Sequence, residues 1–569
     1  MSPLRVWAPY ARRVDVVLGS ERRPMATADG ETFELAAELA PGTRYAFSLD
    51  GGEPLPDPRS RWQPDGVHGA SAAWRGTADA GGWRGRDLRS SVLYELHVGT
   101  FTPEGTFDGA IARLDHLVAL GVGAVSLMPL AEFTGARGWG YDGVDLYAPH
   151  HAYGGPAGLD RFVAACHDRG IAVVLDVVYN HVGPDGNHLA RFGPYFTDRH
   201  RTPWGEAVNF DGLGSAQVRE FVVDNTLAWM SEHAVDGVRV DAVHAIYDAS
   251  ATHVIEQLTA RVDELERATG RTLWVIAESD LNDPRVVRER ERWGWGCDAQ
   301  WSDDLHHALH ALLTGERIGY YGDFGRVADL AKALRDAFVY DGRASAYRRR
   351  THGRPVGDLG GERFLAYAQT HDQVGNRARG ERLAQLVGAG RLRIAAAVVL
   401  LSPFVPMLFM GEEWGAASPF LYFTDHSDPA LARAVTEGRR REYAAFGWRP
   451  EDIVDPQSRE AFERSRLDWS EPGREPHRAL LEWYRALIAL RRDVAELRDG
   501  RRDLAEVAFD EDARWLRMSR GPVTLALALD HGAEVPVSEG DLVLASDPAI
   551  RQGRGTVILP PDSVAVIRR

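Results

Sequence analysis

Four apolar stretches of the sequence each end in side chains that can carry out acid–base chemistry, and the stretch 237–244 is the clearest of them. In an extended strand, Val238 and Val240 point to one side, and Arg239 and Asp241 point to the other. Burying a charged pair on one face of a strand is costly unless that face opens on a site. A guanidinium so near a carboxylate favours the ionised carboxylate, so Asp241 is suited to act as a nucleophile.

The other three stretches also carry acids or histidines near their C-terminal ends. Cleavage of a glycosidic bond needs an acid that protonates the leaving oxygen and a carboxylate on the far side of the sugar. Glu278 follows apolar residues that would raise its pKa, as a general acid requires, so Glu278 and Asp241 form a candidate pair. We interpret Asp176 as a buried hydrogen-bond acceptor. The three stretches are 171–181 with Asp176 and His181, 273–280 with Glu278, and 364–376 with His371 and Asp372.

The elements that must position these acids alternate between strand-like and helical patterns from about residue 86 onward. Eight strands interleaved with helices predict a closed parallel (β/α)8 barrel of the α/β class. Such barrels keep their chemistry at the C-terminal ends of the strands, which is where the acids fall. The predicted strands are the four stretches above together with 92–98, 122–128, 297–301 and 405–410.

The chain of 569 residues is too long for one ordinary core, and the pattern predicts three domains. Residues 1–85 alternate like half-buried strands and predict an N-terminal β-sandwich of the carbohydrate-binding type. Residues 86–498 form the catalytic barrel with loop insertions. Residues 499–569 return to alternation and predict a small C-terminal β-domain.

Two long insertions, 183–213 and 314–362, interrupt the barrel pattern. Long loops on the active face of a barrel usually shape a binding cleft. The second insertion contains a predicted helix at 327–338 and the basic run 348–350. We interpret the basic run as a solvated surface.

Charge and cysteine content exclude several classes of protein. The net charge of -16 argues against nucleic acid or an anionic membrane as a partner. Cys166 and Cys297 lack metal-ligand spacing and cannot form a disulfide framework. The longest apolar run, 394–410, is broken by prolines, so it predicts a helix and a strand and not a membrane span. Without an N-terminal run suited to a signal peptide, we expect a cytoplasmic protein that uses no cofactor and no metal.

Taken in order, the four stretches resemble the four sequence regions of the α-amylase superfamily of glycoside hydrolases. The resemblance implies that Asp241 is the nucleophile, Glu278 the acid/base, and Asp372 the residue that holds the sugar hydroxyls in the distorted transition state. It also implies that His181 and His371 hydrogen-bond that sugar and that Tyr141 forms the aromatic platform beneath it. A single histidine, or a tyrosine among glycines, would more often be structural; the joint occurrence of the four regions favours the functional interpretation.

Within the superfamily, the chain looks most like the malto-oligosyltrehalose trehalohydrolases, which release trehalose from the end of a maltooligosaccharide. Three positions depart from the general amylase pattern: Thr370 stands where Asn usually precedes the His-Asp pair, His244 where Lys is common, and Ala245 where His usually follows. These positions are expected on the leaving-group side. The resemblance spans nearly the whole chain and is carried by 239–244, 277–284, 298–307, 371–376, 410–415 and 419–426.

Side chains after the sixth strand are expected to point toward the same mouth and to suit a hydroxyl-rich disaccharide. The alternative is that Asp303 or Asp304 only caps the N-terminus of the next helix. The full set of predicted substrate-binding residues is Tyr141, His181, Arg239, His244, Asp303, Asp304, His306, His307, His371, Gln373 and Asn376.

The predicted function is hydrolysis of the α-1,4 bond next to a terminal trehalose by a retaining two-carboxylate mechanism. A glycogen-branching or debranching enzyme shares the N-terminal module and the four regions and stays open as an alternative. A non-catalytic sugar-binding relative would normally have lost one of the three acids, and all are present. A metal-dependent enzyme is disfavoured: Asn180 matches a calcium-binding position of many amylases, but the loop after it offers no acidic ligand set.

Overall fold

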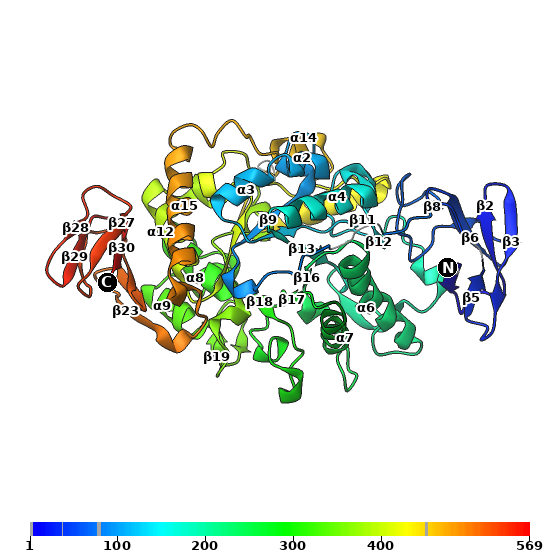
Figure 1. The fold of residues 1–569 in the computed structure, drawn as a ribbon, viewed down its shortest axis with the longest axis horizontal. Helices are drawn as coiled ribbons and strands as arrows, with labels where there is room; N and C mark the ends of the chain where they lie inside the picture. Colours follow the sequence, from blue (N-terminus) through cyan, green and yellow to red (C-terminus); the bar gives the residue numbers. More distant parts are fainter. Residues whose placement is uncertain (1–3, 37, 77–80, 446, 450–452) are drawn as a thin grey trace.

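The computed structural model describes residues 4–36, 38–76, 81–445, 447–449 and 453–569. Its parts follow one another along the longest axis of the molecule, with N-terminal sheets at one end, a barrel in the middle and C-terminal sheets at the other end (Figure 1). One core of buried apolar side chains runs through all three parts, because residues of the N-terminal strands, the barrel and the C-terminal strands belong to the same cluster.

The middle of the chain forms a closed barrel of eight parallel strands, as predicted. Every residue of these strands is buried, which explains why they read as continuous apolar runs and not as alternating ones. The strands are β9 (Leu93–Leu96), β10 (Ala124–Leu127), β13 (Ala172–Val177), β16 (Gly237–Val240), β17 (Trp274–Ala277), β18 (Ala299–Trp301), β21 (Phe364–Ala366) and β22 (Val405–Phe409).

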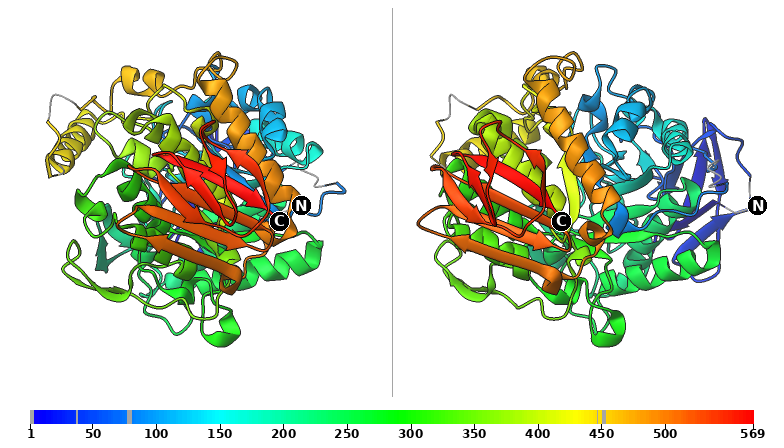
Figure 2. Two further views of the ribbon diagram at one scale, coloured as in Figure 1. Left: turned by 90° about the vertical axis from the view of Figure 1, so that its left-hand side faces the viewer. Right: turned by 60° about the vertical axis from the view of Figure 1, so that its left-hand side comes forward.

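Helices surround the barrel and connect its strands. The α15 helix begins after Pro476 and packs against α12 and α3, while the C-terminal sheets stack on the same side of the barrel (Figure 2). The longer helices are α3 (Leu114–Leu120), α4 (Gly155–Asp168), α6 (Ser215–Glu232), α7 (Val254–Thr269), α8 (Asp303–Thr314), α9 (Val327–Asp336), α12 (Ala389–Leu401), α13 (Pro429–Ala445) and α15 (His477–Asp493). The shorter ones are α1 (Val98–Phe101), α2 (Phe107–Ile111), α5 (Leu189–Phe192), α10 (His371–Gly375), α11 (Leu383–Leu386) and α14 (Arg459–Arg464).

Antiparallel sheets flank the barrel at both ends, as predicted. The N-terminal sheets have the strand orders β1-β5-β4 and β3-β2-β6-β7, and β8 also pairs with β6; the C-terminal sheets have the orders β23-β24-β25-β30-β27 and β26-β29-β28. The N-terminal strands are β1 (Leu4–Trp7), β2 (Val14–Leu18), β3 (Glu21–Pro24), β4 (Ala26–Thr27), β5 (Thr32–Leu35), β6 (Arg44–Leu49), β7 (Pro54–Leu55) and β8 (Ser71–Ala72). The C-terminal strands are β23 (Ala505–Asp510), β24 (Trp515–Arg520), β25 (Val523–Ala528), β26 (Ala533–Pro536), β27 (Asp541–Ala545), β28 (Arg551–Gln552), β29 (Thr556–Leu559) and β30 (Ser563–Arg568).

The two insertions are more ordered than the sequence pattern suggests. The first contains α5 and a hairpin, β14 (Phe196–Thr202) with β15 (Gly205–Val208). The second contains α9 and a hairpin, β19 (Asp341–Ser345) with β20 (Arg350–Gly353). A further hairpin, β11 (Ala131–Glu132) with β12 (Asp145–Pro149), encloses the loop that carries Tyr141. Antiparallel pairing gives each insertion its own backbone hydrogen bonds, so each can hold side chains in fixed positions over the barrel.

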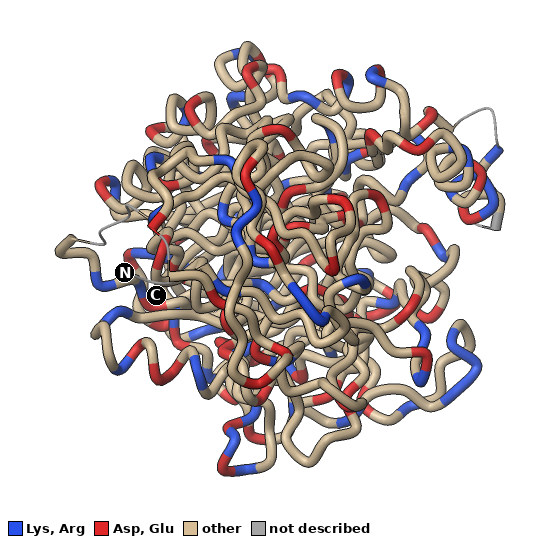
Figure 3. Tube along the Cα trace, turned by 90° about the vertical axis from the view of Figure 1, so that its right-hand side faces the viewer, with Lys and Arg blue, Asp and Glu red and all other residues tan. Residues whose placement is uncertain are grey.

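The remaining predictions from composition can be compared with this fold. Cys166 and Cys297 are both buried and free. The apolar run 394–410 is divided into α12 and β22. Among the described helices, none combines the length and the apolar character that a bilayer span requires. Acidic and basic residues are interspersed over the N-terminal end of the molecule, which faces the viewer in Figure 3.

Candidate active site

The three acids predicted to be catalytic come together at the mouth of the barrel. Asp241 directly follows β16, Glu278 directly follows β17, and Asp372 lies in α10, which follows β21. All three line one cavity of about 690 Å³. Parallel barrel strands end at the same mouth, so residues far apart in the sequence become neighbours there.

One guanidinium joins the two acids of the candidate catalytic pair. The Arg239 side chain is 1% exposed; its Nη1 donates a hydrogen bond to Asp241 Oδ1 (2.8 Å), and its Nη2 lies 3.1 Å from Glu278 Oε2. The guanidinium lies over the ring of Trp301, with Arg239 Cζ 4.3 Å from the ring centroid. A planar fork held in this way fixes the two carboxyl groups relative to one another.

The surroundings of Asp241 favour its charged form. Burial alone would raise the pKa of Asp241, but the positive charge of Arg239, then His181 and the hydrogen bond from Asn180, outweigh burial and hold that pKa below its ordinary value. Asn180 Nδ2 donates to Asp241 Oδ2 over 2.7 Å. Asp241 is therefore ionised at neutral pH, as a carboxylate nucleophile must be.

The surroundings of Glu278 favour its protonated form. Burial raises the pKa of Glu278, and the charges of Asp241 and Asp372 raise it further, while Arg239 opposes the shift. The backbone N–H of Ala242 donates to Glu278 Oε2 (2.8 Å) and fixes the carboxyl group. Ala242 has φ of +41°, a left-handed conformation that costs a non-glycine residue roughly 1–2 kcal/mol. The two acids thus have pKa values shifted in opposite directions, the arrangement that separates an acid from a nucleophile.

A chain of hydrogen bonds lies beneath these acids. Tyr141 Oη donates to Asp176 Oδ2 and accepts from His371 Nε2, both over 2.7 Å, and His371 Nδ1 donates to Glu95 Oε1 over 2.7 Å. Burial alone would lower the pKa of His371, but the charges of Asp372 and Glu95 outweigh burial and raise it to about 9. A protonated His371 can donate from both ring nitrogens, so the orientation of the Tyr141 hydroxyl is set from behind.

Two residues of this hydrogen-bond chain, Asp176 and Glu95, have roles that the sequence analysis did not assign. Asp176 is buried, as interpreted, but it accepts hydrogen bonds from Tyr141 and from Arg239 Nη1 (2.7 and 2.6 Å), so it holds both the platform and the bridging guanidinium in place. Glu95 of β9 was not predicted. Its signal in the sequence is a single acid within the apolar run 92–98, and its partner His371 lies 276 residues further along the chain.

Aromatic side chains form the walls of the larger cavity. His181 lies on one wall, stacked on the ring of Trp204 with centroids 4.9 Å apart; Trp204 is 53% exposed in the turn of the β14–β15 hairpin. Also in this lining, Arg439 of α13 has its Cζ 3.8 Å from the Tyr422 ring centroid and donates to Asn376 Oδ1 (2.8 Å). The sequence did not single out Trp204 or Arg439, because nothing in their local pattern relates them to the barrel. Tyr422 lies in the stretch 419–426, which carries the resemblance, but it was not predicted as a site residue. Other residues lining this cavity include Trp139, Tyr141, Asp142, His244 and Glu442.

A second cavity of about 250 Å³ adjoins the first and shares Glu278, Asp372 and Asn376 with it. Burial raises the pKa of Asp303 to about 8, and burial lowers the pKa of His307 to about 3, so both side chains face this cavity uncharged at neutral pH. The remaining residues of its lining are Asp280, Trp301, Tyr320, Tyr347, Arg348 and Gln373.

Only two of the four polar residues predicted after the sixth strand reach the cleft. Asp304 is buried and accepts hydrogen bonds from the backbone N–H groups of Val339 (2.6 Å) and Tyr340 (2.8 Å). His306 is buried between Ala368 O (2.8 Å) and Tyr321 Oη (2.9 Å). The prediction was wrong for these two because β18 leads directly into α8. Residues 303 and 307 are four apart and lie on the helix face that borders the cavity, whereas residues 304 and 306 lie on other faces of the helix. The N-cap of α8 is Ser302, so neither aspartate is the cap.

The interpretation of 348–350 as a solvated surface was also wrong in part. Arg349 and Arg350 are exposed, but Arg348 turns inward and its Nη1 donates to Asp280 Oδ2 over 2.9 Å. The same Asp280 lies 3.9 Å from His244 Nε2. His244 lines the larger cavity together with the acid Glu278.

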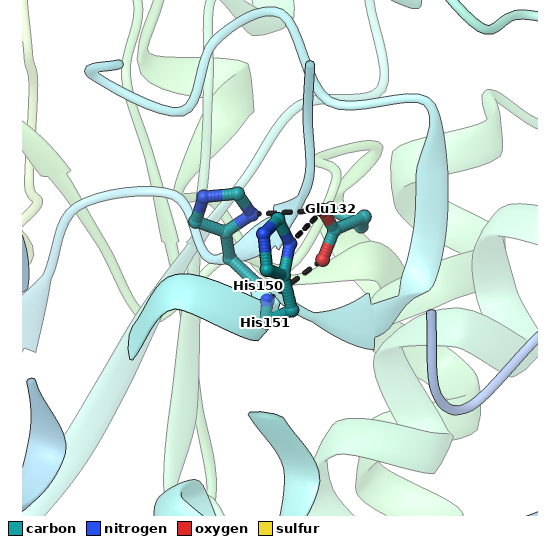
Figure 4. Close-up of side chains that lie close together, drawn as sticks. All are labelled: Glu132, His150 and His151. Carbon is teal, nitrogen blue, oxygen red and sulfur yellow. Dashed lines mark hydrogen bonds and ion pairs between the residues drawn. The ribbon is translucent and has the colours of Figure 1, made fainter. Parts of the chain in front are cut away.

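Within the described part of the chain, one group of histidine and carboxylate side chains could hold a metal: Glu132, His150 and His151 (Figure 4). Both histidine Nδ1 atoms hydrogen-bond Glu132 Oε1 (3.0 and 2.6 Å), and the backbone N–H of His151 donates to Glu132 Oε2 (2.8 Å). These bonds join β11 to the end of β12, on either side of the loop with Tyr141. We interpret the group as a hydrogen-bonded clamp for that loop, because its carboxylate is already occupied by donors.

Comparisons with known proteins agree on the kind of molecule. The family model described as the catalytic domain of α-amylase matches residues 65–194. A malto-oligosyltrehalose trehalohydrolase from Arthrobacter ramosus is 50% identical over 576 residues, covering 99% of both chains. A malto-oligosyltrehalose trehalohydrolase from Rhizobium sp. (strain M-11) is 48% identical over 582 residues, covering 99% of this chain and 97% of the other. Among solved structures, a putative α-amylase from Salmonella typhimurium superposes with a TM-score of 0.91 at 38% identity, covering 99% of this chain and 97% of that one.

Proposed function

The chain belongs to the malto-oligosyltrehalose trehalohydrolase family of the α-amylase superfamily, and on that basis we propose that it hydrolyses the α-1,4-glucosidic bond next to a terminal trehalose. Its substrate is a maltooligosyltrehalose, and its products are free trehalose and a shortened maltooligosaccharide. The observation that carries the proposal is the buried Arg239, which bridges two carboxyl groups whose pKa values are shifted in opposite directions.

The reaction proceeds in two steps with retention of configuration. In the first step, Asp241 attacks the anomeric carbon of the glucose over Tyr141, the bond to the trehalose oxygen breaks, and Glu278 gives its proton to that oxygen. In the second step, water attacks the same carbon, its proton passes to Glu278, and the ester bond to Asp241 breaks. Asp372 binds the sugar hydroxyls of the distorted ring. Arg239 keeps the free Asp241 carboxylate ionised before the attack and again after the ester bond breaks.

Several predicted contacts have defined places in this mechanism. His181 flanks the platform Tyr141 and lines the larger cavity, and Asn376 continues the wall toward α13. His371 is fully buried and is not among the residues that line either cavity, so it holds Tyr141 from behind and does not contact the sugar as predicted. His181 Nε2 donates to the Tyr141 carbonyl (3.0 Å), which fixes its ring at the edge of the sugar. Gln373 Oε1 accepts from the backbone N–H of Thr370 (2.8 Å), and Thr370 caps α10. The Thr370 departure from the amylase pattern therefore acts through the placement of Asp372.

The leaving trehalose is proposed to occupy the smaller cavity. That cavity contains the acid Glu278 but neither the platform Tyr141 nor the nucleophile Asp241, so it lies on the side of the bond that leaves. Trehalose differs from maltose in the linkage of its two glucoses, so discrimination must occur there. A site with polar groups such as the half-buried Asp303 and the buried His307 leaves them unpaired when the wrong disaccharide enters, which is a strong basis for rejection.

Chromatography of the products tests the proposal directly. A maltooligosyltrehalose should release trehalose with a much higher kcat/KM than a maltooligosaccharide of the same length. Glycogen serves as a third substrate, and new branches or debranched chains would identify the alternative activity. Equal kcat/KM for the two oligosaccharides would make the protein a general α-glucanase.

A further inference from the structure

A third cavity, of about 650 Å³, lies where the N-terminal module meets the barrel, and the proposed function makes no use of it. Its described lining comes from the N-terminal module and from Glu232, the last residue of α6. None of these residues lines either cavity of the active site. The space is almost as large as the cavity that contains the three acids, so it can hold a ligand of comparable size.

Two arginines of the segment after β7 join the N-terminal module to α6 across this cavity. Arg61 Nε and Nη2 donate to the two carboxylate oxygens of Glu232 (2.9 and 2.8 Å). Arg59 Nη1 donates to Asp224 Oδ2 (2.9 Å), and the Arg59 guanidinium makes no other hydrogen bond to the described residues. Since the Arg59 side chain is 33% exposed and lines the cavity, its remaining nitrogens can donate to a ligand there.

The charges around the cavity are balanced. Each of the four arginines in the described lining forms an ion pair with a carboxylate, so an anion would have to compete for every guanidinium. A neutral ligand with many hydroxyl groups can instead accept from the guanidinium nitrogens and donate to carboxylate oxygens, because each of these oxygens has two lone pairs. The pairs are Arg5 with Glu34, Arg59 with Asp224, Arg61 with Glu232, and Arg75 with Glu38.

The cavity also has an aromatic wall. Trp74 lines it half-buried, and the ring of Trp62 packs edge-on against Trp74 with the centroids 5.9 Å apart. The backbone after Trp74 lies against α6, since a Cβ added at Gly76 would come within 2.6 Å of the carbonyl oxygen of Glu232. A pyranose ring has apolar C–H groups on its faces and hydroxyl groups around its edge, so it matches an aromatic wall beside charged hydrogen-bonding groups.

The position of the cavity separates it from the reaction. With 18 residues, α6 is about 27 Å long. It begins shortly after the β14–β15 hairpin, whose Trp204 lines the active site, and it ends at Glu232, before the start of β16. The start of a barrel strand lies at the face opposite the active site. A short oligosaccharide over Tyr141 therefore does not extend to this cavity, whereas a long glucan chain can.

We propose that this cavity is a second binding site for α-1,4-glucan chains, outside the active site. A glucose unit stacks on Trp74, and hydroxyl groups of the chain bond Arg59 and Glu232. The site holds a long glucan on the enzyme and so raises the local concentration of its trehalose end, while the chemical step is unchanged. The chemistry of the cavity selects a neutral sugar chain, and the choice of an α-1,4-glucan rests on the proposed function.

Native gel electrophoresis with soluble amylose in the gel measures this binding, with every variant placed in the Asp241→Asn background so that the polymer is not digested. Trp74→Ala removes the stacking ring and should weaken the apparent affinity for amylose about tenfold. Tyr141→Ala, which removes the platform of the active site, should leave that affinity within about threefold. The matched control is Trp293→Ala, at a tryptophan that is 90% exposed and lies outside the cavity, and it should change nothing.

Kinetics of Trp74→Ala in the active enzyme separate anchoring from a structural effect. KM for a long-chain maltooligosyltrehalose should rise about fivefold to tenfold with kcat unchanged, while kcat/KM for maltotriosyltrehalose changes by less than about twofold. If both substrates lose the same factor and the melting temperature falls, Trp74 only stabilises the junction, and the proposal is overturned. Trp74→Phe keeps a ring and should retain most of the affinity; a loss as large as that of Trp74→Ala would also overturn it.

The outcome for the wild type keeps this proposal distinct from the proposed function. If amylose does not retard the wild-type chain in the Asp241→Asn background, the second site is refuted, whatever the enzyme hydrolyses. If amylose retards it through Trp74 but the active enzyme shows no preference for a trehalose end, the proposed function fails and the glucan site stands.

Discussion

Replacing Glu95 by Gln perturbs the buried charges behind the sugar platform while preserving size. Glu95 accepts hydrogen bonds from His371 Nδ1 (2.7 Å) and from the backbone N–H of His371 (2.9 Å). Burial would lower the pKa of His371, but Asp372 and Glu95 together raise it from 6.5 to about 9. A raised pKa means that the folded state holds a proton that the unfolded state releases, which stabilises the fold by about 3 kcal/mol below the unfolded pKa. Because Asp372 is still present, we expect Glu95→Gln to remove about 2 kcal/mol of this stabilisation of the folded state.

The direction in which the stability difference changes with pH gives a second test of this prediction. For a histidine with a raised pKa, the stabilisation is fully present below pH 6.5 and is lost as the pH rises through about 9. Urea-denaturation midpoints of wild type and Glu95→Gln should therefore differ most near about pH 6 and converge near about pH 10. Glu53→Gln, at an exposed position, is the control and should not change the midpoint at either pH. A difference between wild type and Glu95→Gln that is the same at all pH values would refute the role of the buried charge pair.

The remaining predictions concern the reaction itself. Asp241→Asn and Glu278→Gln should each nearly abolish turnover with the fold intact by circular dichroism; a variant within about tenfold of wild type in kcat, a loss of only ~1.4 kcal/mol, would contradict the stated role of that residue. Proton NMR of the newly formed reducing end, taken early, should show the α-anomer, and a β-anomer would exclude Asp241 as the nucleophile. EDTA should leave activity unchanged, because Asn180 is engaged by Asp241 and Glu132 by its two histidines; loss restored by Ca²⁺ or Zn²⁺ would contradict this.

The sequence by itself determined the barrel and the place of its acids. Strands buried on both faces must be apolar along most of their length, so their runs are visible without any partner. An acid at the end of such a run, as at Asp241 or Glu278, lies at the mouth of any closed parallel barrel, whatever the loops do. The opposite pKa shifts of these two acids also follow largely from neighbours in the sequence, since Arg239 precedes Asp241 by two residues and apolar residues precede Glu278.

The tertiary structure alone decided which polar side chains outside these runs reach the cleft. Asp304 and His306 lie beside Asp303 and His307 in the sequence, but the rotation of α8 turns them into the protein, where they bind other groups. Local composition could not show this, because the direction of a helix face depends on where the preceding strand places the first turn.

The partners of Glu95 and Arg348 were equally invisible in the sequence. Glu95 meets a histidine 276 residues away, and Arg348, within a run that looks like solvated surface, meets an aspartate 68 residues before it. Such pairs depend on the path of the backbone through the barrel and its insertions, and no local periodicity records that path. Burial then makes the pairing obligatory, since a charge removed from water needs an opposite charge or hydrogen bonds.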